Sequence, residues 1–199
     1  KLGFMKKSYS LLSANHLDLA SDIDNKIESI DYLHFDLTDG VFCPTLGLSI
    51  LTLEQLSAHK KLGIDVHLLV QNPLDVVKRI KDLELETLIF HQETITEAEF
   101  NNLSYENKKI GIALMPVTDI KSLNNYIKHA DCVLLLCITP SLFPDEDSKI
   151  VIENRVNEFY ETFPNFNKRL IVDGGVNIDM LPKLKSLNVT DIVIGSKFF

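Results

Sequence analysis

The stretch Leu33-His34-Phe35-Asp36-Leu37-Thr38-Asp39-Gly40 places two titratable side chains in an otherwise apolar strand and then ends it in a turn. Side chains alternate between the two faces of a β-strand, so His34 and Asp36 point to the same side, about 7 Å apart along the backbone. Imidazole and carboxylate groups at positions where apolar residues are expected indicate a metal site or an acid–base pair. The Asp39-Gly40 pair is a turn signal, to which we assign no catalytic role.

Two later segments repeat this design. Asp65-Val66-His67-Leu68 and Val172-Asp173-Gly174-Gly175 both combine aliphatic strand residues with a titratable group near a strand end. Three strand ends therefore offer four candidate ligands, which are His34, Asp36, His67 and Asp173. Asp65 lies two residues before His67 on the same face of its strand, so we expect it to support the ligands from behind.

Length and charge limit the class of protein. A chain of 199 residues with 45% hydrophobic content can bury one core, and we expect residues 1–199 to form a single domain. The formal net charge of −8 disfavours nucleic acid as a partner, because its phosphates are bound by Lys and Arg. An anionic substrate must therefore be captured by local groups, against the overall field.

Cysteine usage and apolar runs indicate the compartment. The chain has three cysteines, Cys43, Cys132 and Cys137, without the pair spacing of a zinc site, which argues against a disulfide framework and favours the cytoplasm. The longest apolar runs, such as residues 132–138, are strand-sized, and no signal sequence opens the chain. We therefore expect no membrane association.

Hydrophobic spacing predicts an alternation of strands and helices. The expected strands are residues 5–11, 32–36, 64–70, 87–90, 110–114, 132–138, 169–172 and 191–194. The expected helices between them are residues 17–30, 49–62, 73–83, 95–103, 119–128, 147–163 and 178–187. Two of the helices have start signals, Asn72-Pro73 and Asn177.

This rhythm is typical of an α/β protein with a (β/α)8 barrel, the TIM barrel, in which catalytic groups gather at the carboxyl ends of the strands. The alternative is a doubly wound open sheet, but no Gly-x-Gly-x-x-Gly turn follows the first strand. The given chain stops at Ser196-Lys197-Phe198-Phe199, where an eighth helix should begin. We therefore expect a barrel whose eighth helix is absent from the given chain.

Short motifs follow one another in order along the expected elements. They lie at residues 10–15, 34–44, 65–69, 91–93, 173–176 and 195–196. Ser10-Leu11-Leu12-Ser13-Ala14-Asn15 is similar to Ser-x-Leu-Ser-Ala-Asp, and residues 34–44 are similar to His-x-Asp-x-Met-Asp-Gly-x-Phe-Val-Pro. Together these motifs resemble the ribulose-phosphate 3-epimerase family over nearly the whole chain.

The resemblance implies a ribulose-phosphate-binding-type barrel and a metal-dependent epimerase of carbohydrate metabolism, in the pentose phosphate pathway. It implies that His34, Asp36, His67 and Asp173 bind one divalent metal ion, with Asp36 and Asp173 also forming the proton-transfer pair. The donor set suits Zn, Fe(II), Mn or Co, and the sequence does not choose among them. Ser10 resembles the family serine that hydrogen-bonds the substrate near the metal.

The chemistry gives an independent reason for this arrangement. Inverting a hydroxyl-bearing carbon next to a ketone requires removal of a proton, an enediolate, and return of a proton to the opposite face, so two bases are needed. A metal stabilises the negative charge as a Lewis acid. The substrate phosphate would be bound by backbone N–H groups at Gly174, Gly175, Gly195 and Ser196, while Ser10 and His67 would contact the sugar.

The chain departs from the family pattern at several positions. Thr38, Leu69 and Leu136 stand where the family has methionines. The family's Pro-Gly-Phe-Gly-Gly-Gln loop after the sixth strand corresponds to residues 140–147, which end in Asp145-Glu146-Asp147. Lost glycines and added carboxylates predict weaker phosphate binding, if the loop faces inward.

Three functions stay open. The first is a 3-epimerase of a small phosphorylated sugar, most simply ribulose 5-phosphate to xylulose 5-phosphate. The alternative is a non-catalytic or divergent barrel that binds another sugar phosphate, such as a ketohexose 6-phosphate, because of the altered loop 140–147. A related barrel lyase is disfavoured, since its Asp-x-Lys motif is absent from Asp36-Leu37-Thr38. The sequence also leaves open the oligomeric state, a homo-oligomer included, and whether His91 and Glu93 serve the site or the fold.

Overall fold

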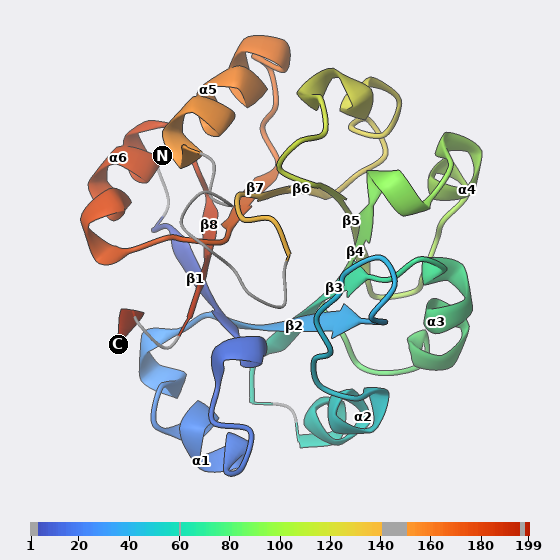
Figure 1. The fold of residues 1–199 in the computed structure, drawn as a ribbon, viewed down its shortest axis with the longest axis vertical. Coiled ribbons are helices and arrows are strands. Elements are labelled where there is room, and N and C mark those ends of the chain that lie inside the picture. Colours follow the sequence, from blue (N-terminus) through green and yellow to red (C-terminus); the bar gives the residue numbers. More distant parts are fainter. Residues whose placement is uncertain (1–3, 60, 141–150, 196–197) are drawn as a thin grey trace.

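Eight parallel strands close into a barrel in the order β1-β2-β3-β4-β5-β6-β7-β8, so the predicted (β/α)8 fold is confirmed (Figure 1). The structure is a computed structural model that describes residues 4–59, 61–140, 151–195 and 198–199. Its strands are β1 (Lys6–Ser10), β2 (Tyr32–Thr38), β3 (Gly63–Leu69), β4 (Thr87–His91), β5 (Lys109–Leu114), β6 (Cys132–Leu136), β7 (Arg169–Asp173) and β8 (Asp191–Ile194).

Helices surround the barrel, as Figure 1 shows. The α-helices are α1 (Leu19–Asp24), α2 (Ile50–His59), α3 (Pro73–Ile80), α4 (Glu97–Asn101), α5 (Ile152–Thr162) and α6 (Leu181–Ser186). The 3-10 helices are η1 (Leu11–Ser13), η2 (Ile27–Ser29), η3 (Gln92–Thr94), η4 (Ile120–Asn125) and η6 (Ile178–Met180). None of these described helices has the length and the apolar character that a membrane span requires.

Three expected helices differ from the observed ones, and one of them, residues 178–187, begins as the 3-10 helix η6 before α6. Residues 119–128 form only the 3-10 helix η4, whose buried side chains are Ile120 and Leu123, because a spacing of three suits a 3-10 turn. Residues 17–30 divide into α1 and η2, since Asp24 and Asn25 are poor helix formers at the break. The start of the expected helix 147–163 and the position of an eighth helix at 196–197 lie outside the described residues.

Both predicted helix starts are found. Pro73 is the first residue of α3, where its missing N–H costs no hydrogen bond. The Asn177 side chain accepts hydrogen bonds from the backbone N–H groups of Asp179 at 3.0 Å and Met180 at 3.2 Å. Asn177 therefore caps the helix that follows β7.

Apolar side chains fill both sides of the sheet. An outer layer packs between strands and helices and includes Phe35, Phe90 and Phe159, all fully buried. An inner layer lies inside the barrel and consists of Cys43, Leu69, Ile89, Ala113, Cys132, Leu134, Leu136, Ile171 and Val193. Because both faces of each strand are covered, the strands read as apolar runs rather than as alternating patterns.

A charged cluster lies at the amino ends of the strands. We call Asp65, Thr87, Arg169 and Asp191 the amino-end cluster. The Arg169 guanidinium donates to Asp191 Oδ1 from Nε at 3.0 Å and Nη2 at 2.8 Å, to Asp65 Oδ2 at 2.9 Å, and to Thr87 Oγ1 at 3.3 Å. One permanent cation thus bridges two buried carboxylates.

This arrangement corrects the expectation for Asp65. Its carboxylate forms an ion pair with Arg169, and within the described ranges it makes no hydrogen bond to His67. The side chains of both residues do face the same side of β3, but Asp65 lies one inward-facing position nearer the amino end. Its role is therefore to hold the strands together below the site.

Candidate metal centre and active site

Four side chains meet at the carboxyl ends of β2, β3 and β7. One ligand atom from each of His34, Asp36, His67 and Asp173 lies within 4.8 Å of the others. The pairing of β2 with β3 puts Asp36 opposite His67, and β7 brings Asp173 to the cluster because it ends at that residue. We call these four residues the carboxyl-end cluster.

Both imidazoles face the same two carboxylate oxygens. His34 Nε2 lies 3.2 Å from Asp36 Oδ1 and 3.5 Å from Asp173 Oδ2. His67 Nδ1 lies 3.1 Å from Asp36 Oδ1 and 3.6 Å from Asp173 Oδ2. The two ring nitrogens and the two carboxylate oxygens therefore surround one small volume.

Among the described residues, histidines are the only basic side chains paired with the two carboxylates of the cluster. Both histidine side chains are fully buried, and the Asp36 and Asp173 side chains are 7% and 14% exposed. Among the residues that the structure describes, neither carboxylate pairs with Lys or Arg, and both ring nitrogens of His34 lack a hydrogen-bond partner. Buried carboxylates and an unpartnered imidazole are costly, so this donor set fits a divalent cation of the Zn, Fe(II), Mn or Co type.

The pKa values show how strongly the groups act on each other. Burial lowers the pKa of His34, but the charges of Asp36 and Asp173 outweigh it and raise that pKa well above its usual value. Burial raises the pKa of each carboxyl, yet the two histidines outweigh it and hold the pKa of Asp36 and of Asp173 below the ordinary value. Positive charge at this point is therefore favoured.

A chain of hydrogen bonds leads from His67 away from the cluster. His67 Nε2 lies 2.8 Å from His91 Nε2, and His91 Nδ1 lies 3.0 Å from Glu93 Oε2. The other carboxylate oxygen of Glu93 accepts from the Met115 backbone N–H at 2.8 Å and from the Thr118 hydroxyl. The structure thus joins His91 directly, and Glu93 through His91, to the candidate ligand His67.

The environment keeps this chain in defined charge states. Burial lowers the pKa of His91 to about 4, so its ring is neutral near pH 7. Burial raises the pKa of Glu93, but the hydrogen bond from His91 and the other donors outweigh it and lower that pKa. A neutral imidazole therefore stands between an ionised carboxylate and His67.

A cavity of about 220 Å³ opens onto Asp36 and Asp173. Ser10, at the end of β1, lines it and donates from Oγ to Asp36 Oδ2 at 3.2 Å. Apolar and thiol groups cover much of the remaining wall, and these are Leu12, Cys43, Leu69, Leu136 and Ile138. The residues at the methionine positions Leu69 and Leu136 thus keep the wall apolar.

The glycines predicted for phosphate binding occupy special backbone positions. Gly174 and Gly175 have φ of +95° and +77°, the left-handed region that favours glycine. A Cβ on Gly174 would lie 2.4 Å from Ile138 Cγ2, so the turn also depends on close packing. A Cβ on Gly195 would meet Ser13 Oγ at 3.2 Å. Ser196 and residues 141–147 of the altered loop lie outside the described residues.

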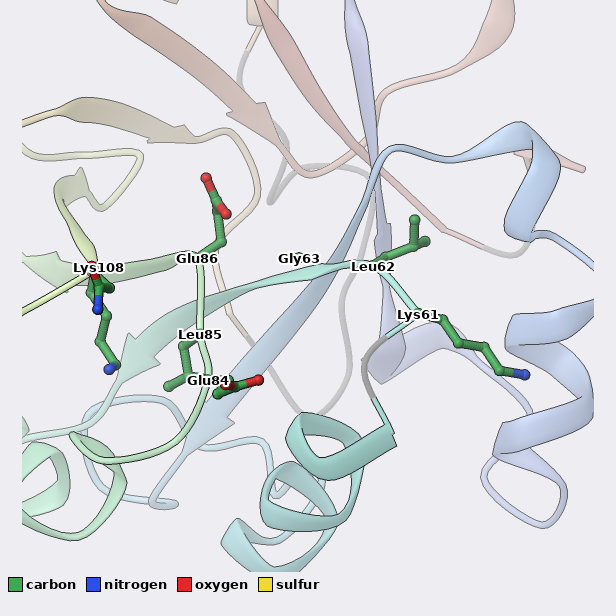
Figure 2. A pocket seen from close by; sticks show the side chains of 8 residues that line it. Lys61, Leu62, Gly63, Glu84, Leu85, Glu86 and Lys108 are labelled. Atoms are coloured by element: carbon green, nitrogen blue, oxygen red, sulfur yellow. The ribbon is translucent and has the colours of Figure 1, made fainter.

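A second hollow, of about 400 Å³, lies at the opposite end of the strands and is lined by Lys61, Leu62, Gly63, Glu84, Leu85, Glu86, Asn107 and Lys108 (Figure 2). Figure 2 shows its labelled charged side chains pointing away from one another. Lys61 pairs with Asp24, and Glu86 pairs with Lys109 at 2.7 Å. Because its charged groups diverge, this larger hollow is a poorer candidate than the cavity at the carboxyl ends.

Comparisons with known proteins identify a family. The sequence model of the ribulose-phosphate 3 epimerase family matches residues 6–199. The chain is 31% identical to a ribulose-phosphate 3-epimerase of Buchnera aphidicola over 98% of this chain and 90% of the relative. It is 30% identical to the enzyme of that name from Helicobacter pylori over 98% of this chain and 91% of the relative.

Solved structures show the same fold at lower identity. Phosphoribosyl anthranilate isomerase from Thermus thermophilus superposes with a TM-score of 0.66 at 13% identity, covering 96% of this chain and 88% of that one. A 3-hexulose-6-phosphate synthase superposes with a TM-score of 0.61 at 13% identity, covering 96% and 90%. At these identities the likeness concerns the barrel alone.

Proposed function

The chain belongs to the ribulose-phosphate 3-epimerase family, and from this premise we propose that it interconverts ribulose 5-phosphate and xylulose 5-phosphate with a divalent metal ion in the carboxyl-end cluster. The observation that carries the proposal is the convergence of His34, Asp36, His67 and Asp173 within 4.8 Å. The chain is an isomerase that acts on carbohydrates.

The four cluster residues would hold the ion through two imidazole nitrogens and two carboxylate oxygens. When bound, a divalent cation supplies Lewis-acid stabilisation of the negative charge that develops on the oxygens of the substrate. The position of His34 Nε2, 3.2 Å from Asp36 Oδ1 and 3.5 Å from Asp173 Oδ2, supports this assignment, because a cation there would contact the nitrogen and both carboxylates. The identity of the bound ion depends on its affinity for this donor set and on its supply.

Asp36 and Asp173 would move the protons. Epimerisation breaks a C–H bond on one face of the carbon next to the ketone and forms a C–H bond on the opposite face. Asp36 comes from β2 and Asp173 from β7, and both line the cavity. One carboxylate takes the proton while the other, protonated, gives one, and the two exchange roles in the reverse reaction. The Ser10 hydroxyl, bonded to Asp36 Oδ2, helps to orient that carboxylate.

The sugar phosphate would bind above the cluster. Ser10 and His67 would contact the sugar, and the backbone N–H groups of Gly174, Gly175, Gly195 and Ser196 would bind the phosphate. The positive φ of Gly174 and Gly175 supports this, because such turns expose successive N–H groups to an anion.

A second candidate has the same chemistry but a different sugar. The acidic sequence of residues 140–147 in place of a glycine-rich loop favours a ketose phosphate of another size, such as a ketohexose 6-phosphate. Comparing the two substrates at equal concentration distinguishes the candidates.

Proton exchange in deuterated water tests the proposal. Ribulose 5-phosphate is incubated with the metal-loaded protein, and NMR follows the C3 proton and the xylulose 5-phosphate signals. We expect deuterium at C3 and an equilibrium mixture of both sugars, with neither change in protein stripped by a chelator. If the loaded wild-type protein leaves the C3 proton in place with both the pentose and the hexose phosphate, the proposed function is wrong.

A further inference from the structure

We propose that Glu93 and His91 are positioning residues that fix the proton of His67 on Nε2 and thereby leave His67 Nδ1 free to bind the metal ion. The inference rests on the proposed metal centre. It concerns two residues that make no contact with the four donor atoms except through His67, which His91 touches at 2.8 Å.

The orientation of His67 decides which nitrogen can be a ligand. Nδ1 faces the carboxylates, at 3.1 Å from Asp36 Oδ1 and 3.6 Å from Asp173 Oδ2. Nε2 faces the opposite way, at 2.8 Å from His91 Nε2. A metal ligand must be unprotonated, so a liganding His67 carries its single proton on Nε2.

That proton determines the state of His91. Two ring nitrogens 2.8 Å apart form a hydrogen bond only when one donates and the other accepts. If His67 Nε2–H donates, His91 Nε2 accepts, and the proton of the neutral His91 ring is on Nδ1. Glu93 Oε2, 3.0 Å from that nitrogen, is an acceptor of the required kind. A single arrangement of protons therefore satisfies every hydrogen bond from Glu93 through His91 to His67.

Glu93 is held so that it imposes this arrangement. Its Oε1 accepts from the Met115 backbone N–H at 2.8 Å and from the Thr118 hydroxyl, which leaves Oε2 for His91. The rings of His67 and His91 are fully buried and nearly parallel, with centroids 4.9 Å apart and an interplanar angle of 20°, so they meet edge to edge. An ionised carboxylate at the end of such a chain also increases the basicity of the liganding imidazole.

Replacing Glu93 by its amide, Glu93→Gln, should reverse every proton in the chain. The Met115 N–H is a fixed donor, so the carbonyl oxygen of the introduced amide would take the Oε1 position and its NH₂ would face His91. His91 Nδ1 would then accept and its Nε2 would donate to His67 Nε2. The proton of His67 would move to Nδ1, where it meets Asp36 Oδ1 and excludes a cation.

The experiment measures metal binding and ring tautomers. Co²⁺ or Zn²⁺ alone is titrated against a chromophoric chelator in the wild type, in Glu93→Gln and in the matched control Glu99→Gln. Glu99 lies six residues further along, in the capping box of α4, so its change removes a carboxylate of the same segment without touching His91. We expect the Glu93→Gln affinity to fall about 10–100-fold and the control to keep the wild-type value.

Nitrogen-15 NMR of the histidine rings reads the tautomer directly and needs no variant. In the wild type, with or without metal, we expect His91 protonated at Nδ1 and its Nε2 accepting. Two results would overturn the proposed proton arrangement. One is a Glu93→Gln variant that binds metal as tightly as the wild type, and the other is a wild-type protein in which His91 is protonated at Nε2. If instead the wild type neither binds metal nor epimerises its substrate, the proposed function is wrong. The tautomer of His91 then still shows whether the proposed proton arrangement is correct.

Saturating metal separates positioning from folding. Because the variant changes the state of a ligand and not the barrel, Glu93→Gln should regain epimerisation as the metal concentration rises. Its thermal unfolding in the metal-free form should stay close to that of the wild type. A variant that binds metal weakly only because it is partly unfolded would show a lowered unfolding temperature, and that result contradicts the positioning role.

Discussion

The barrel encloses two clusters that each bury two carboxylates, and the two clusters balance this negative charge in different ways. In the amino-end cluster, Arg169 bridges Asp65 and Asp191 at 2.9 and 2.8 Å. In the carboxyl-end cluster, Asp36 and Asp173 face two imidazoles, and His34 has no hydrogen-bond partner in the described part of the chain. Strands β3 and β7 contribute to both clusters, at positions that point to the same interior.

The difference supports the proposal that the carboxyl end of the barrel acts on a ligand. Buried carboxylates need a compensating cation, and the amino-end cluster carries one in its own sequence. The carboxyl-end cluster has two carboxylates and, within the described residues, no Lys or Arg paired with them, so their charge is balanced by protonated histidine or by a cation from solution. A cation that is part of the chain suits a structural role, whereas an exchangeable cation next to a cavity suits chemistry on a substrate.

The largest expected effect breaks the carboxyl-end cluster. Changing Asp36 or Asp173 to Asn should lower epimerase turnover at least ~10³-fold, because each face of the reacting carbon needs its own base and the metal is weakened too. Turnover at saturating ribulose 5-phosphate and metal measures this. Asp179→Asn, an exposed change near the same strand end, serves as the control. A variant that keeps more than about a tenth of wild-type turnover would refute the two-base assignment.

Breaking the amino-end cluster should affect stability instead. Arg169→Met leaves Asp65 and Asp191 buried without their cation, and we expect a loss of about 3–5 kcal/mol in the free energy of unfolding by urea. Turnover per folded molecule should remain within about threefold of wild type. Replacing all three residues by apolar ones should recover much of the loss, because no charge is then left buried. A loss below about 1 kcal/mol in the single variant would show that Arg169 is not needed for charge balance.

Removing the metal ion should lower the stability of the protein, as the loss of Arg169 does, but by a smaller amount. A ligand present at about 100 times its Kd adds about 2.7 kcal/mol of stability, so a chelator should lower the unfolding temperature of the loaded wild type. His34→Gln, which removes one ligand, should respond weakly to the chelator. Equal responses of the two proteins would place the stabilising ion elsewhere.

The smallest expected effect is the loss of one hydrogen bond in the amino-end cluster, which should change stability and leave metal binding unaltered. Thr87→Val removes one hydroxyl that accepts from Arg169 at 3.3 Å and should cost about 1 kcal/mol. Metal affinity, measured by the same chelator competition, should not change. A weaker metal affinity would show that the two clusters are coupled through the barrel interior.

Sequence patterns predicted the part of this design that lies within single strands. The apolar runs predicted all eight strands to within two residues at either end. The alternation of side chains and the family resemblance placed His34, Asp36, His67 and Asp173 near strand ends. Contacts between distant strands could not be predicted in this way. Asp65 and Arg169 are 104 positions apart, and only the register of the closed barrel brings them together.

The sequence nevertheless contains some indications of these contacts between strands. Arg169 opens an apolar strand at an inward-facing position, as Asp65 and Asp191 do near the starts of theirs, and opposite charges at equivalent positions suggest an ion pair. The His91–Glu93 chain was visible only as a motif, since its meaning depends on the 2.8 Å approach of His91 to His67. In the short helix η4 the buried residues Ile120 and Leu123 repeat with a period of three, which resembles the 3.6-residue period of an α-helix over so few residues.

Anomalous diffraction from crystals grown with Co²⁺ or Zn²⁺ tests the central contrast most directly. Data collected above and below the absorption edge of the metal locate the ion without reference to activity. We predict one strong peak between His34, Asp36, His67 and Asp173 and none beside Arg169. An empty carboxyl-end cluster, with the same metal bound elsewhere or not at all, would contradict the account.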